Sequence, residues 1–144
     1  MFSVKEFLTH SAEETTILGR DLAALLTPPK LVLLQGDLGS GKTTLVKGIV
    51  EYLGGAKRQE VTSPTFNLIH EFHSPAAEIY HIDLYRIDTP RQLETLGIDD
   101  LTSLRSLILI EWGEKFERFH RNRDVEIVFE RTGENARRIR VTGL

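Results

Sequence analysis

The chain has 144 residues and a formal net charge of −3, from 18 basic and 21 acidic residues. This charge argues against nucleic-acid binding through a broad basic surface, so that only a local basic patch could bind nucleic acid. Because the chain has no cysteine, disulfide bonds, cysteine-ligated zinc and thiol catalysis are excluded. No apolar run approaches the roughly 18 residues that a membrane-spanning helix needs, so we expect no membrane segment.

The first predicted element is a helix that starts at a capping box, with Ser11 as the N-cap and Glu14 as the third helical residue. Pro28 and Pro29 are expected to end this helix. Its apolar face is predicted from the helical spacing of Leu18, Leu22, Leu25 and Leu26.

A glycine-rich octet, residues 36–43, follows a short apolar strand at 31–34 and precedes a helical segment at 44–53. Its sequence, Gly-Asp-Leu-Gly-Ser-Gly-Lys-Thr, matches the phosphate-binding loop pattern G-x-x-x-x-G-K-[ST]. Glycines let a backbone wrap an anion with its N–H groups, and the N-terminus of the following helix adds positive potential. The alternative is a chance glycine-rich turn before a surface helix, which is disfavoured because strand, helix, lysine and threonine all stand in register.

We expect this loop and the residue after it to bind the phosphates of a nucleotide. Lys42 is expected to reach the β- and γ-phosphates, and the hydroxyl of Thr43 to bind Mg²⁺. The chain lacks the Asn-Lys-x-Asp motif that guanine-reading GTPases show, which favours ATP as the nucleotide. The predicted phosphate-binding residues are Gly36, Asp37, Leu38, Gly39, Ser40, Gly41, Lys42, Thr43 and Thr44.

The remaining predicted elements are strands and one short helix. Segments 66–72 and 79–84 read as an antiparallel hairpin, and segment 107–110 as a strand buried on both faces. Thr89 opens a second capping box with Pro90 at the first helical position. The alternating residues of 125–141 predict a second hairpin at a sheet edge. Together these elements predict one α/β domain over 1–144, a P-loop NTPase-like mixed sheet with flanking helices and antiparallel hairpin additions.

Two carboxylates are candidates for the metal that accompanies the nucleotide. Glu111 follows the buried strand directly, at the carboxyl end where ligands sit in open α/β sheets. Asp83 lies late in its own strand, where it is either a second catalytic carboxylate or a structural partner of Arg86 or a turn cap. We predict Lys42 as a catalytic residue, and either Glu111 or Asp83 as the carboxylate that completes the metal site with Thr43.

Other positions near the expected nucleotide are less sharply defined by chemistry. Thr65 belongs to the segment 62–66, which is either a loop that senses the γ-phosphate or a polar turn fixed by proline. Trp112 is either an ordinary core or rim aromatic or a residue at the nucleotide.

Four short strings in this chain together resemble the bacterial TsaE family, also called YjeE. They are the glycine-rich loop through Thr44, Thr-Ser-Pro-Thr-Phe at 62–66, Tyr-His-Ile-Asp-Leu-Tyr-Arg at 80–86 and Leu-Ile-Glu-Trp at 109–112. Their order and spacing fit over nearly the whole chain.

The resemblance implies a small cytoplasmic ATPase required for threonylcarbamoyladenosine at position 37 of tRNA. It implies slow ATP hydrolysis alone, action with the TsaD and TsaB proteins, and tRNA contact through that complex. By motif it implies catalytic roles for Thr65, Asp83 and Glu111 and metal roles for Thr43 and Glu111. It also suggests an adenine region formed by Ser11 to Thr15 and by Arg137. We include Trp112 among the residues expected to bind the nucleotide.

Two other functions use the same loop. A kinase for a small metabolite or nucleoside would need an acceptor pocket and usually an arginine-rich lid, for which 144 residues leave little room. A nucleotide-gated adaptor would bind ATP chiefly to fix a partner surface.

Overall fold

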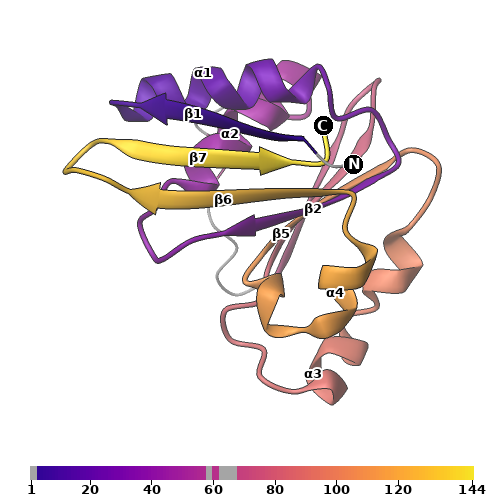
Figure 1. The fold of residues 1–144 in the computed structure, drawn as a ribbon. Helices are drawn as coiled ribbons and strands as arrows, with labels where there is room; N and C mark the ends of the chain where they lie inside the picture. The colour runs from indigo at the N-terminus through magenta and orange to yellow at the C-terminus, as the bar shows by residue number, and fades with distance from the viewer. Residues whose placement is uncertain (1–2, 58–59, 62–67) are drawn as a thin grey trace.

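The computed structural model describes residues 3–57, 60–61 and 68–144, and within them the strands form one seven-stranded sheet in the order β1-β7-β6-β2-β5-β4-β3 (Figure 1). The strands are β1 Val4–Thr9, β2 Lys30–Gln35, β3 Ile69–His73, β4 Glu78–Asp83, β5 Ser106–Glu111, β6 Val125–Arg131 and β7 Arg137–Thr142. The α-helices are α1 Ala12–Ala23, α2 Lys42–Leu53, α3 Pro90–Thr95 and α4 Glu117–Asn122, and two short 3₁₀ helices are η2 Ile98–Leu101 and η3 Gly113–Lys115.

The centre of the sheet is parallel and its two sides are antiparallel. Strand β2 pairs in parallel with both β5 and β6, and β4 pairs in parallel with β5. The pairs β3–β4, β6–β7 and β1–β7 are antiparallel. Both predicted hairpins and the predicted mixed α/β sheet of the P-loop type are therefore confirmed.

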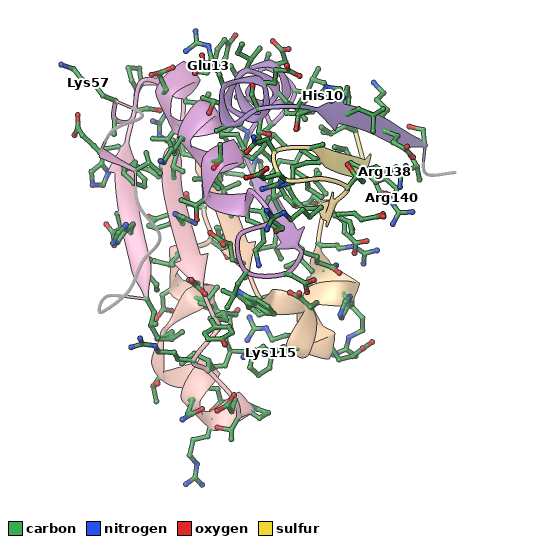
Figure 2. The ribbon with its side chains drawn as sticks, turned by 90° about the vertical axis from the view of Figure 1, so that its left-hand side faces the viewer. His10, Glu13, Lys57, Lys115, Arg138 and Arg140 are labelled. Carbon is green, nitrogen blue, oxygen red and sulfur yellow. The ribbon has the colours of Figure 1, made fainter. Side chains whose placement is uncertain are left out.

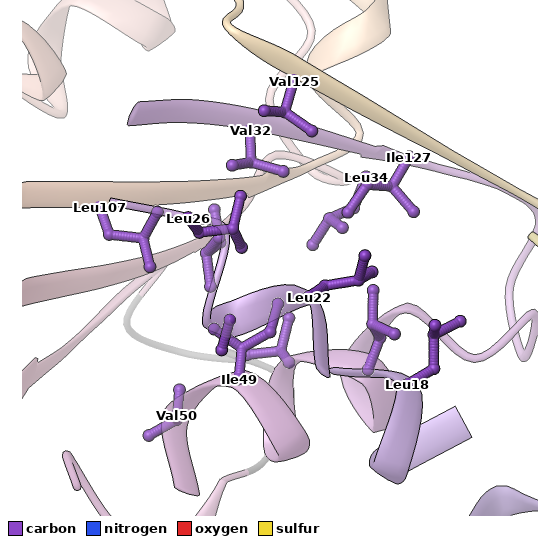
Figure 3. Packing of buried hydrophobic residues seen from close by; sticks show 14 of the residues in the cluster. Leu18, Leu22, Leu26, Val32, Leu34, Ile49, Val50, Leu107, Val125 and Ile127 are labelled. Atoms are coloured by element: carbon purple, nitrogen blue, oxygen red, sulfur yellow. The ribbon is translucent and has the colours of Figure 1, made fainter. Parts of the chain in front are cut away.

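Apolar side chains cover both faces of the parallel strands, which is why their sequences are nearly continuous in hydrophobic residues. One core lies between the sheet and helices α1 and α2, and Figure 3 shows Leu22 and Ile49 of these helices facing Val32 and Leu34 of β2. The other face is covered by α3, η2, η3 and α4, and its core contains Ile110, Phe116 and Phe119. The sheet is thus held between two layers of helices.

Both predicted helix starts are present. The Oγ of Ser11 accepts a hydrogen bond from the N–H of Glu14, whose carboxylate in turn accepts from the N–H of His10 and not from that of Ser11. Thr89 and Gln92 form the complete reciprocal box at α3, with Pro90 as its first residue. Each cap satisfies backbone donors that a helix start leaves without a partner.

Two expectations were wrong in detail. Helix α1 ends at Ala23, several residues before the two prolines, so Leu25 is 51% exposed and does not belong to the core. The hairpin β6–β7 is not the sheet edge, because residues 4–9 add strand β1 to β7.

The charged segment before β6 contains helix α4, held by the buried side chain of Phe119. Among the described residues, no helix has the length and apolar character needed to cross a membrane.

Helices α1 and α2 cross with their backbones in contact at two glycines. A Cβ atom built on Gly48 would lie 2.0 Å from the carbonyl oxygen of Thr16, and one on Gly19 would lie 2.2 Å from that of Leu45. Any side chain at either position would force the helices apart. Since α2 carries the glycine-rich loop at its N-terminus, this crossing also fixes where the loop sits.

Substituting Gly48→Ala is expected to lower the free energy of unfolding by about 1–3 kcal/mol, the usual cost of forcing an extra methyl into a packed core. Urea denaturation followed by circular dichroism measures this change. Gly133→Ala is the matched control, because its added Cβ would meet only the Cβ of Ala136, at 3.4 Å. Equal stability of the two variants would show that the helices can separate without cost.

Candidate phosphate-binding site

The glycine-rich loop joins the end of β2 to the start of α2, as the sequence predicts. Gly36, Gly39 and Gly41 all have positive φ angles, of 155°, 74° and 107°, in a region that other residues rarely adopt. Gly41 is also the N-cap of α2, so the free N–H groups of the helix start face the loop. The loop forms one wall of a cavity of about 330 Å³ lined by Leu38, Gly39, Ser40, Gly41, Lys42, Thr43, Thr44, Asp83, Glu111, Trp112 and Arg137.

Lys42 lines this cavity and is only 4% exposed as a residue. Its ammonium donates a hydrogen bond to the carbonyl of Gly36 at 2.6 Å and lies 3.9 Å from the centre of the Trp112 ring. Burial lowers the pKa of Lys42, and the carboxylates of Glu111 and Asp83 partly oppose that change by favouring the charged form. A buried ammonium with this little solvation is well prepared to bind an anion.

The carboxylate of Glu111 is buried at the end of β5 and is held by two side chains. Its Oε2 accepts a hydrogen bond from the hydroxyl of Thr43 at 3.2 Å. The same oxygen lies 2.5 Å from Nε2 of His81, which is fully buried on β4. The two groups chosen as metal contacts are therefore neighbours, although they are 68 residues apart in the chain.

Asp83 stands beside Glu111 because β4 and β5 are paired in register at these two residues. Its Oδ1 accepts the N–H of Tyr85 at 2.9 Å, so it has the turn-capping role that was one of its two expected roles. It also lines the cavity, so the catalytic role stays a prediction alongside the structural one.

Trp112 closes the cavity on the side of the strand ends. It is the single residue other than glycine with a positive φ among the described residues, at 65°. This turn brings its ring 5.1 Å from that of Tyr85 and over the ammonium of Lys42. Lys115, labelled in Figure 2, donates to the carbonyl of Tyr85 at 3.0 Å and joins the two turns. Trp112 is thus a rim residue of the site and not a core aromatic.

A second, smaller cavity of about 80 Å³ adjoins the loop on the side of α1 and the β6–β7 turn. Thr15 in its wall is buried, and its hydroxyl is bonded to that of Thr9 at 2.8 Å. The lining brings the three residues of the predicted adenine region together with the loop: Ser11, Ala12, Thr15, Gly41, Thr44, Asn135 and Arg137.

The residues present fit a magnesium triphosphate. The hydroxyl of Ser40 is buried without a hydrogen-bond partner in the described part of the chain, which suits a loop built to close around an anion. A hydroxyl and a carboxylate oxygen, from Thr43 and Glu111, are the hard ligands that Mg²⁺ prefers. The group would be held by the loop, by Lys42 and by these two oxygens.

The structure brings most of the predicted site residues to the two cavities. Gly36 and Asp37 belong to the loop but line neither cavity, and Thr65 lies outside the described residues. Arg86 is exposed and does not line the cavity. Sequence reasoning missed His81 as a partner of Glu111. The available signal was its position two residues before Asp83, which places both side chains on the same face of β4.

Comparisons with known proteins find one family model, several similar sequences and a similar solved structure. The sequence model of the family described as "Threonylcarbamoyl adenosine biosynthesis protein TsaE" matches residues 9–139. The tRNA threonylcarbamoyladenosine biosynthesis protein TsaE of Bacillus subtilis is 35% identical over 136 residues, which is 94% of this chain and 84% of that protein. The protein of the same name from Aquifex aeolicus is 32% identical, with 96% of each chain covered. The crystal structure of YdiB from Bacillus subtilis superposes with a TM-score of 0.75 and 30% identity, covering 99% of this chain and 86% of that one.

Proposed function

Because this chain belongs to the TsaE family of tRNA threonylcarbamoyladenosine biosynthesis proteins, we propose that it is the ATP-binding and slowly ATP-hydrolysing component of that modification. We propose that residues 1–144 act as one P-loop ATPase domain. The observation that carries the proposal is the partly buried hydrogen bond between Thr43 and Glu111, beside the ammonium of Lys42.

In this proposal the backbone N–H groups of the loop and the ammonium of Lys42 hold the β- and γ-phosphates of ATP. Thr43 and Glu111 hold Mg²⁺, which when bound supplies positive charge against the negative charge that develops on the transferred phosphoryl group. His81 keeps the carboxylate of Glu111 in place by its contact at 2.5 Å. Asp83 stands on the neighbouring strand, facing the same cavity.

Among the described residues, the cavity lining does not contain a complete set of groups for fast hydrolysis. Its described lining contains no histidine, and its only arginine, Arg137, donates to the carbonyls of Gly39 and Ser40. In related phosphate-loop enzymes an arginine supplied by a partner raises the rate by about 10³–10⁵. We therefore propose that turnover depends on partners, that these partners are TsaD and TsaB, and that tRNA is reached through their complex.

The experiment is to measure ATP and ADP binding by calorimetry in magnesium buffer and to follow phosphate release with and without TsaB and TsaD. We expect binding of both adenine nucleotides, slow phosphate release by the chain alone, and faster release with the partners. Fast turnover without partners would contradict the proposal, and so would the absence of any heat of binding. ATP-dependent phosphorylation of a nucleoside or sugar would instead identify a kinase.

A further inference from the structure

The guanidinium group of Arg137 contacts only backbone carbonyl groups in the described part of the chain. Its Nε donates to the carbonyl of Ser40 at 2.9 Å, and its Nη2 donates to that of Gly39 at 3.1 Å. Its Nη1 donates to the carbonyl of Ala136 at 2.9 Å, with the carbonyls of Gly133 and Glu134 at the limit of hydrogen bonding, 3.5 Å. Two of its five N–H donors thus tie the β6–β7 turn to the glycine-rich loop, and Nη1 bonds within the turn itself.

The hydrogen bonds from Arg137 to the carbonyls of Gly39 and Ser40 restrict the direction in which the loop's peptide groups point. The carbonyl of Ser40 and the N–H of Gly41 belong to one planar trans peptide and point in opposite directions. Holding the carbonyl on Arg137 therefore turns the N–H of Gly41 away from the guanidinium. A phosphate loop works by aiming such N–H groups at the anion, and Gly41 has no side chain to fix its own backbone.

The β6–β7 hairpin supports the loop from the same side. A Cβ atom built on Gly41 would lie 3.8 Å from Nε of Arg137, from the ring of Phe129 and from the methyl of Thr15. One on Gly36 would lie 3.0 Å from both the Cβ and the carbonyl of Phe129. The back of the loop is thus packed against β6, and Arg137 adds the directional bonds that packing alone cannot supply.

We propose that Arg137 is a positioning residue, which fixes the shape of the phosphate loop through the carbonyls of Gly39 and Ser40, and that this is its main role instead of contact with the nucleoside. The part of the inference that concerns ligands rests on the proposed function. The part that concerns the loop does not, because the bonds are made by the protein alone.

Calorimetry with inorganic tripolyphosphate and with ATP separates the two roles. Tripolyphosphate has no nucleoside, so a positioning role predicts that Arg137→Ala weakens both ligands by the same factor, about ten-fold or more. A nucleoside contact predicts that only ATP is weakened, which would overturn the inference, as would unchanged affinity for both. Arg138→Ala is the matched control, because Arg138 pairs with Glu6 and Glu130, and Figure 2 shows it beside Arg140, away from the loop.

Arg137→Lys tests whether charge alone suffices. Lysine keeps the positive charge but lacks the planar fork that holds two carbonyls at once, so we expect it to leave most of the loss in place. Full recovery of tripolyphosphate binding by lysine would show that Arg137 acts only through its charge.

Hydrogen exchange of the nucleotide-free protein tests the loop without any ligand. We expect the amides of Ser40 and Leu45, which donate to the carbonyls of Asp37 and Gly41, to exchange about ten-fold faster in Arg137→Ala than in the unmodified protein or in Arg138→Ala. Unchanged exchange there would overturn the inference even if the nucleotide proposal holds. If instead the unmodified protein binds no nucleotide, the proposed function fails while the exchange result still decides the role of Arg137.

Discussion

Replacement of Lys42 by alanine is expected to weaken the binding of ATP and ADP by about 100-fold or more. Hydrogen bonds between charged groups are worth roughly 1.5–3 kcal/mol each, and 1.4 kcal/mol corresponds to a factor of ten in affinity. Because Lys42 is 4% exposed, it would meet the phosphates where little water weakens the attraction. Calorimetric titration in magnesium buffer gives the change directly.

The control for this substitution is Lys47→Ala, which removes a lysine from the same helix but not from the cavity lining. Its nucleotide affinity should equal that of the unmodified protein. Thermal melts of both variants show whether either has lost its fold. If Lys42→Ala binds ATP as tightly as the Lys47→Ala control, the phosphates do not lie where the loop pattern places them.

Replacement of Glu111 by glutamine is expected to reduce ATP turnover by about 100-fold or more without lowering the nucleotide affinity measured in the absence of Mg²⁺. Glutamine has the shape of glutamate, and its amide oxygen can still accept from Thr43, so the fold should persist. What is lost is the negative charge that would hold the metal, and removal of one group that organises transition-state charge typically costs a factor of 10²–10³. Phosphate release and the effect of Mg²⁺ on nucleotide affinity are the two measurements.

The control for Glu111→Gln is Glu94→Gln, which changes an exposed carboxylate of α3 away from the cavity. Its phosphate release and its Mg²⁺ dependence should equal those of the unmodified protein. Unchanged turnover and unchanged Mg²⁺ dependence in Glu111→Gln would make the metal assignment wrong. Asp83→Asn would then be the variant to measure, because Asp83 is the adjacent strand-end carboxylate in the cavity. Loss of hydrolysis with retained function of the complex would indicate a nucleotide-gated adaptor.

Features encoded by residues close together in the chain could be predicted from the sequence. The glycine-rich loop, the capping box at Thr89 and both hairpins depend on patterns spanning a few residues. Strand β1 could not be found in this way, because its residues are mostly exposed on both faces and give no apolar alternation. Its position depends on pairing with β7, at the other end of the sequence.

Dependence on contacts between distant parts of the chain also explains why the role of His81 was not predicted. His81 and Glu111 are 30 residues apart, and their contact requires β4 to lie beside β5 in one particular register. The loop pattern identifies Lys42 and Thr43 but contains no information about which strand end approaches them. The role of Arg137 at the loop likewise depends on a contact across 97 residues. The part of Thr65 in the site stays a prediction.

The carboxylates around Lys42 have a consequence for the form in which a polyphosphate can enter. Four carboxylates favour the charged form of this one ammonium, those of Glu111, Glu114, Asp83 and Asp37. Negative groups therefore outnumber the positive charge of Lys42 around it. A bare polyphosphate would add further negative charge to this region and be repelled by it. A polyphosphate already neutralised by its counterions would not be, so the local charge balance favours entry of the neutralised species.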